Sequence, residues 1–150
     1  MTSLTALPQA IAAILSTEDT LDGVPIIQSF SKTVTGDVET ALAGSGQCIW
    51  VMPALPKDTL RTDTAAIFFR SVEVRIRLLD RPSVSPSPGN IHELVGLVPL
   101  CLQGINPDDL CAEGLSLSAT PVTTGMEGSD LYFDLTFTAA MHLFAVELEP

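Results

Sequence analysis

Apolar residues recur at steps of three and four in two segments of the chain, a spacing that places them on one face of an α-helix. These segments cover residues 4–15 and 91–102. Within the second segment, Gly96 and Pro99 interrupt the pattern. Because Pro99 lacks an N–H and clashes with the preceding turn, we expect a kink or an early end of this helix. A shorter helix is predicted over residues 35–44.

Apolar and polar residues alternate along residues 64–80, which is typical of a strand with one buried face. The apolar side carries Val72, Val74, Ile76 and Leu78. Arg70 falls on that same side, which either a bulge near residues 69–71 or an arginine directed to a partner would explain. Further strands are predicted over 24–30, 47–55, 115–124 and 129–139, the last two joined by a turn at 125–128.

Two segments rich in proline, residues 53–63 and 81–90, are predicted as exposed loops. The strand over residues 47–55 is apolar on both faces, which suits a central position in the sheet. The order is then helix, strand, short helix, strand, long strand, helix, strand, strand. This order indicates one α+β domain over residues 1–150, with a mostly antiparallel sheet and the helices packed on one sheet face.

The chain is rich in apolar residues for a small protein. Hydrophobic residues make up 46% of its 150 residues and charged residues 17%. A domain of this size buries a limited fraction of its surface, so we expect a partner surface, most simply in a homo-oligomer. No run approaches the roughly 20 apolar residues of a membrane-spanning helix, so no membrane association is predicted.

Charge is distributed unevenly along the sequence. The net charge is −11, which argues against a protein that grips nucleic-acid phosphates. Five of the seven basic residues nevertheless fall in one window, at positions 61, 70, 75, 77 and 81. One interpretation is a solvated strand whose arginines pair with Glu73, Asp80 and neighbouring strands, at about 0–1 kcal/mol for each exposed pair.

The other interpretation is a subunit interface in which Arg70, Arg75 and Arg77 meet acidic residues of the next copy. Alternating charge of this kind would set register and orientation more than affinity. Reversing the charge of Arg75 or Arg77 should then weaken assembly. The two interpretations remain open at the level of the sequence.

The sequence offers little catalytic chemistry. His92 and His142 are the two histidines, and neither accompanies a recognisable nucleophile motif. The three cysteines, Cys48, Cys101 and Cys111, match no paired zinc-binding spacing and are predicted to be buried, reduced thiols. The acidic pairs 18–19 and 108–109 are expected to be solvated, since no further ligands converge on them. We therefore predict no enzyme activity, no metal and no cofactor.

Aromatic residues allow a second interpretation of the chain. Trp50 and the pair Phe68–Phe69 fit either core packing or the wall of a ligand pocket. The first is favoured because these residues lie on predicted strands. A pocket around Trp50 and Phe68 would instead favour a small ligand-binding α+β domain.

Three stretches taken together resemble a known family. They are the opening helix LTALPQAIAAIL, the strand FRSVEVRIRLLD with the later helix IHELVGLVPLCLQGI, and the closing hairpin LSLSATPVTTGMEGSDLYFDLTFTA. In this order they resemble the tail terminator proteins of long-tailed phages and, more loosely, the head–tail completion proteins. The helix departs from a smooth pattern at Gly96 and Pro99.

The resemblance implies a structural virion protein at the head–tail junction. Such proteins form a homohexameric ring that caps the tail tube and meets the neck or connector proteins, while DNA passes through the lumen without specific binding. Another ring-forming connector protein is the alternative within this class. The implied location is the tail or neck of a virion assembled in the host cytoplasm. The predicted loops 53–63 and 81–90 are expected to dock on the tube or sheath.

Overall fold

The computed structural model describes residues 4–28, 33–61, 66–85, 90–111, 113–118 and 123–144. Within these ranges, the side chains of residues 58–61, 66–70, 90, 123 and 142–144 lie outside the described part. Residues 145–150 also lie outside it. No helix in the described ranges is long and apolar enough to cross a membrane.

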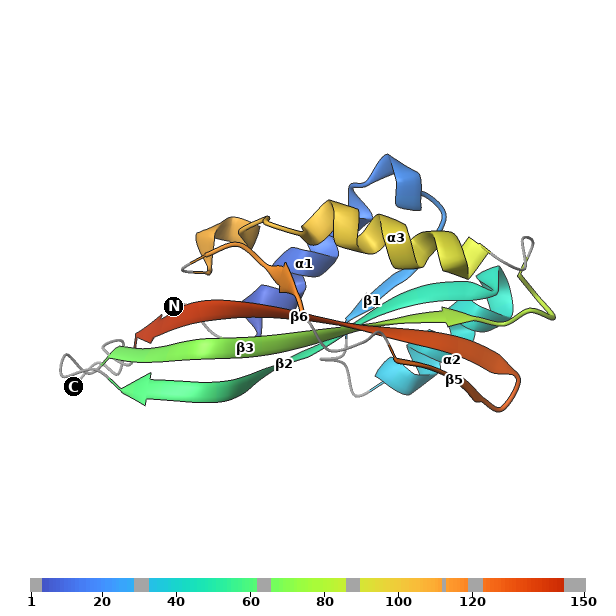
Figure 1. The fold of residues 1–150 in the computed structure, drawn as a ribbon. Coiled ribbons are helices and arrows are strands. Elements are labelled where there is room, and N and C mark those ends of the chain that lie inside the picture. The colour runs from blue at the N-terminus through green and yellow to red at the C-terminus, as the bar shows by residue number, and fades with distance from the viewer. Residues whose placement is uncertain are drawn as a thin grey trace.

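Three α-helices and a six-stranded sheet make up the described fold (Figure 1). The helices are α1 (Ala6–Ser16), α2 (Val34–Ser45) and α3 (Asn90–Leu102), with short 3₁₀ turns η1 (Asp19–Leu21) and η2 (Pro107–Asp109). The strands are β1 (Ile26–Gln28), β2 (Gln47–Arg61), β3 (Ala66–Asp80), β4 (Ser116–Leu117), β5 (Thr123–Glu127) and β6 (Asp130–Phe144).

The strand order is β1-β2-β3-β6-β4, and β5 also pairs with β6. Only β1 and β2 run parallel; every other pair is antiparallel. The predicted α+β class with a mostly antiparallel sheet is confirmed.

The main core lies between the sheet and the layer formed by α1 and α3. The fully buried strand residues of this core include Ile49, Val74, Ile76, Leu78 and Phe137. From the helices, Leu7, Ile11, Leu94 and Val98 pack against them. The predicted apolar faces of both helices and of the long strand are therefore the faces that the fold buries.

Helix α2 covers the opposite face of the sheet, below it in Figure 1. Its buried residues Val38 and Leu42 pack on Cys48 and Leu79, which alternate with the main-core positions of β2 and β3. The expected packing on one face thus holds for α1 and α3, whereas α2 covers the second face. The reason is that the first residues of β2 are apolar on both faces of the sheet. The apolar side chains on the second face also have to be buried, and α2 covers them.

Strand β2 is much longer than predicted. Residues 53–61 continue the strand, so the interpretation of 53–63 as a loop is wrong over the described residues. Register shifts follow Val51 and Pro56, where bulges accommodate the two prolines. Beyond Val51, no described strand pairs with β2 on the side where β1 lies. On that side the missing N–H of a proline therefore removes no hydrogen bond between strands.

The pairing of β3 with β6 contains the irregularity expected near Arg70. Its register shifts between Phe69 and Val72, which confirms a bulge at this point. From Val72 onward the alternation is regular, with Val72, Val74, Ile76 and Leu78 fully buried and Arg75 exposed.

Helix α3 continues through Pro99 to Leu102, so of the expected kink or early end, the early end is wrong. Val98 and Leu102 are fully buried on either side of the proline and hold the last turn against the core. The N–H of Gln103 donates to the Pro99 carbonyl at 2.8 Å, which closes the helix normally. Packing of an apolar stripe outweighs the one backbone hydrogen bond that proline removes.

The closing hairpin is confirmed, but its turn lies at Gly128 and Ser129 instead of residues 125–128. Gly125 is a strand residue paired with Tyr132. A Cβ at position 125 would lie 2.8 Å from the Tyr132 hydroxyl oxygen. Glycine at position 125 therefore makes room for the Tyr132 ring and does not form a turn.

Candidate functional site

The side chain of Arg77 on β3 contacts three residues of the neighbouring β5–β6 hairpin. Its Nε and Nη2 donate to the two carboxylate oxygens of Asp134 at 2.8 and 2.9 Å. Its Nη1 lies 3.6 Å from an oxygen of Glu127, and its guanidinium lies 4.3 Å from the ring centre of Tyr132. The hydrogen bonds that Arg77 donates to Asp134 raise the pKa of Arg77 further above its ordinary value, so this arginine stays charged.

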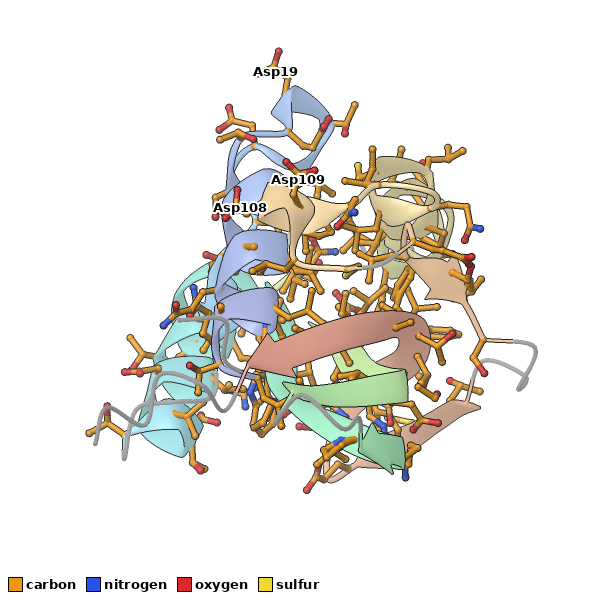
Figure 2. The ribbon with its side chains drawn as sticks, turned by 90° about the vertical axis from the view of Figure 1, so that its left-hand side faces the viewer. Asp19, Asp108 and Asp109 are labelled. Carbon is orange, nitrogen blue, oxygen red and sulfur yellow. The ribbon has the colours of Figure 1, made fainter. Side chains whose placement is uncertain are left out.

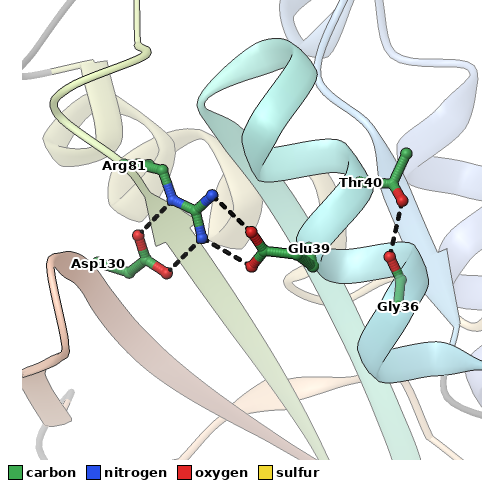
Figure 3. Close-up of polar contacts among 5 residues, drawn as sticks. All are labelled: Gly36, Glu39, Thr40, Arg81 and Asp130. Atoms are coloured by element: carbon green, nitrogen blue, oxygen red, sulfur yellow. Dashed lines mark hydrogen bonds and ion pairs between the residues drawn. The ribbon is translucent and has the colours of Figure 1, made fainter.

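Arg81, just after β3, joins α2 to the same hairpin (Figure 3). Its guanidinium makes two hydrogen bonds of 2.8 Å to Glu39 and two of 2.8 and 3.0 Å to Asp130. The hydrogen bonds to Glu39 and Asp130 raise the pKa of Arg81, and the hydrogen bond from Arg81 lowers the pKa of Glu39. Three segments far apart in sequence are thereby fixed around one cation.

A groove of about 640 Å³ lies over this part of the sheet, between α2 and the β5–β6 hairpin; we call it the α2 groove. Its apolar lining is Val38, Leu42, Trp50 and Leu79, and its charged lining is Glu39, Arg77, Glu127 and Asp130. The side chains of Glu39 and Glu127 are 63% and 75% exposed at its rim. The buried Nε1 of Trp50 has no hydrogen-bond partner among the described residues.

The three arginines predicted at a subunit interface have different surroundings. Arg77 pairs with carboxylates of its own chain, as described above. Arg75 is exposed and forms no ion pair within the described part of the chain. The side chain of Arg70 lies outside that part. Neither interpretation of the arginine strand is decided, and an interface through these residues stays a prediction.

Part of the pairing expected for a solvated arginine strand is observed, because Arg77 pairs with Asp134 on the neighbouring strand β6, whereas Glu73 and Asp80 have other partners. Glu73 pairs with Lys57 at 3.6 Å, and Asp80 is buried and accepts a hydrogen bond from the Gln47 side chain at 3.3 Å. The sequence did not identify Glu39, Asp130 and Asp134 individually as the arginine partners. For Asp134 a signal exists, because it lies on the polar face of the predicted strand 129–139.

The other candidate chemical groups are dispersed. His92 is exposed, and its ring packs edge-on against Phe133 with 5.4 Å between ring centres. The side chain of His142 lies outside the described part. Figure 2 shows Asp108 and Asp109 on η2, with Asp19 farther out, and all three are exposed. Among the described residues, no group of three or more His, Cys, Asp or Glu side chains is placed to bind a metal ion.

The three cysteines are free thiols, with Cys48 and Cys111 buried and Cys101 half-buried. Burial raises the pKa of Cys48 to about 12 and that of Cys111 to about 11, and burial also raises the pKa of Cys101. Because the thiolate is the reactive form, we expect a maleimide or disulfide reagent at neutral pH to modify Cys101 first. Peptide mapping by mass spectrometry measures this order. Equal rates in the folded protein would contradict it, and the denatured chain is the control in which all three react.

Comparison with known proteins identifies a fold neighbour. No protein-family model and no curated protein matches the sequence. One solved chain, from a structure described as the virion of a native gene transfer agent (GTA) particle, is similar over 95% of this chain and 99% of its own length. Its TM-score is 0.61 and its sequence identity 14%. At this identity the likeness shows that the two chains share a fold.

Proposed function

We propose that this chain is a structural protein of a phage-like virion. Within that class we favour a ring-forming protein of the head–tail junction, a tail terminator. The observation that carries the proposal is the near-complete structural overlap with a chain of the gene transfer agent virion, 95% of one chain and 99% of the other. A fold alone does not fix a function, so the experiment below decides.

Surface properties support an assembly role. Among the described residues, three large apolar side chains are more than half exposed: Leu100 at 80%, Met126 at 63% and Leu55 at 52%. These side chains are available for contacts between copies or with a tail tube protein. The net charge of −11 would keep DNA phosphates from adhering to a lumen wall. The exposed apolar side chains and the net negative charge both fit a protein that assembles with other virion proteins and catalyses no reaction.

Electron microscopy and native mass spectrometry of the purified protein test the proposal. We expect ring-shaped particles of six copies, either of the protein alone or after addition of the tail tube protein from the same particle. A protein that remains monomeric at micromolar concentration under both conditions would contradict the ring.

A second candidate is a small-ligand-binding domain, favoured by the α2 groove with Trp50 in its lining. The side chain of Phe68, the other residue expected at such a pocket, lies outside the described part. Monomeric protein that co-purifies with a small molecule and loses it when Trp50 is replaced by alanine would favour this candidate.

A further inference from the structure

We propose that the α2 groove of one copy receives the far end of the β2–β3 strand pair of a second copy, so that copies join head to tail. This inference deepens the proposed function and rests on it. It identifies the two surfaces that would form the contact between neighbouring copies.

The α2 groove combines an apolar floor with a negative rim. Around it, the carboxylates of Glu39, Glu127, Asp130 and Asp134 outnumber the guanidinium groups of Arg77 and Arg81. The two glutamates are the most exposed of these groups, at 63% and 75%. A volume of about 640 Å³ accommodates several side chains. The fitting occupant is therefore an apolar segment with a positive charge.

The chain itself contains such a segment in its sequence, from the last residue of β2 to the fifth residue of β3, although its side chains lie outside the described part. Residues 61–70 read RTDTAAIFFR, with two arginines, one aspartate and the run Ile-Phe-Phe. Their net charge is +1, while the rest of the chain carries −12. Charge complementarity between this end and the α2 groove would select a second copy and set its orientation. We call residues 61–70 the basic end.

The two surfaces lie at opposite ends of one sheet. The groove residues Trp50 and Arg77 lie near the start of β2 and the end of β3, whereas Arg61 and Ala66 lie at the other ends of these strands. Figure 1 shows β2, β3 and β6 extending past the helices at the end away from α2. The eleven residue steps from Ala66 to Arg77 span about 36 Å of strand.

A copy therefore cannot fill its own groove. A contact between unlike surfaces repeats from copy to copy, and it closes into a ring or continues as a filament. This is the type of contact that the proposed ring needs, and the sheet would act as the rigid spacer between successive contacts.

Two single substitutions test the inference. The groove variant carries Glu127→Lys, and the basic-end variant carries Arg70→Glu. Glu127 is 75% exposed and approaches Arg77 only at 3.6 Å, so its replacement leaves the core intact. We expect each variant to weaken self-association by about 100-fold or more, because like charges then meet at the contact. Glu113→Lys, an equal charge change at an exposed residue outside the groove, is the matched control and should assemble normally.

Mixing the two variants gives the sharper result. The groove variant keeps an intact basic end, and the basic-end variant keeps an intact groove. One contact can still form between them, so we expect a one-to-one heterodimer by native mass spectrometry and no ring. Trp50 is the only tryptophan in the chain and lines the groove. When the groove variant also carries Trp50→Phe, the tryptophan fluorescence of the mixture comes only from Trp50 of the basic-end variant. That Trp50 lines the groove that the other variant would fill, so its emission should change on mixing.

The outcomes separate this inference from the proposed function. If wild-type rings form and both variants assemble as well as wild type, the head-to-tail contact is overturned while the virion role stands. Rings that persist in the groove variant but no longer bind the tail tube protein would assign the groove to that protein and also overturn the inference. If no self-association occurs alone or with the tube protein, both proposals fail. Circular dichroism on each variant verifies its folding.

Discussion

Replacement of Arg77 by methionine is expected to lower the free energy of unfolding by about 3 kcal/mol, because it leaves the Asp134 carboxylate without its cation. Asp134 is 7% exposed, and two of its hydrogen bonds come from the Arg77 guanidinium. This loss of about 3 kcal/mol is at the lower end of the range for breaking a buried ion pair, because the groove beside Arg77 lets water approach the pair. Urea denaturation monitored by circular dichroism measures the change.

Arg75→Met is the matched control for this prediction. Arg75 lies two residues away on the same face of β3, is exposed, and forms no ion pair with the described residues. Its replacement should change the free energy of unfolding by less than about 0.5 kcal/mol. The double variant Arg77→Met/Asp134→Leu should recover most of the loss, because no unpaired charge then remains buried. Equal losses in the Arg77 and Arg75 variants would contradict the assigned role of the pair.

Replacement of Gly46 by alanine is expected to cost about 3–5 kcal/mol, the sum of backbone strain and overpacking. Gly46 ends α2 in the left-handed region at φ +76°. A Cβ there would lie 2.4 Å from the backbone N and Cα of Ser85, which cannot move aside as a side-chain end would. The Gly46 carbonyl also accepts a hydrogen bond from the Arg81 N–H, so the clash would disturb the segment that carries Arg81.

Gly23→Ala separates the two causes. Gly23 also has a positive φ, +83°, but a Cβ at this position meets nothing within 4 Å. Only the left-handed conformation is then penalised, at about 1–2 kcal/mol. Thermal and urea unfolding of both variants compare the costs. A Gly46 variant no less stable than the Gly23 variant would show that the segment at Ser85 yields to the added methyl group.

Part of the candidate site could be predicted from the sequence and part could not. The sequence shows that arginines are concentrated on the strand that becomes β3, and it predicts Arg77 as a candidate interface residue. Its partner Asp134 lies 57 positions away and pairs with it only because β3 and β6 are neighbours in the sheet. Glu39 reaches Arg81 only because α2 lies on the second sheet face. Strand order and helix placement are not encoded in the local pattern that identifies each element.

The spacing of apolar residues along the chain is enough to predict which faces are buried. The three- and four-residue spacing in α1 and α3 and the alternation in β3 each predicted the buried side, because removal of apolar surface from water acts on every residue locally. Where such elements end, and which segments they contact, depends instead on the assembled fold. Strand β2 continues past two prolines because bulges and an unpaired side accommodate them, and α3 continues past Pro99 because Val98 and Leu102 are buried. The continuation of both elements past their prolines depends on contacts between segments that are distant in the sequence. The energies of these contacts outweigh the local helix and strand propensities.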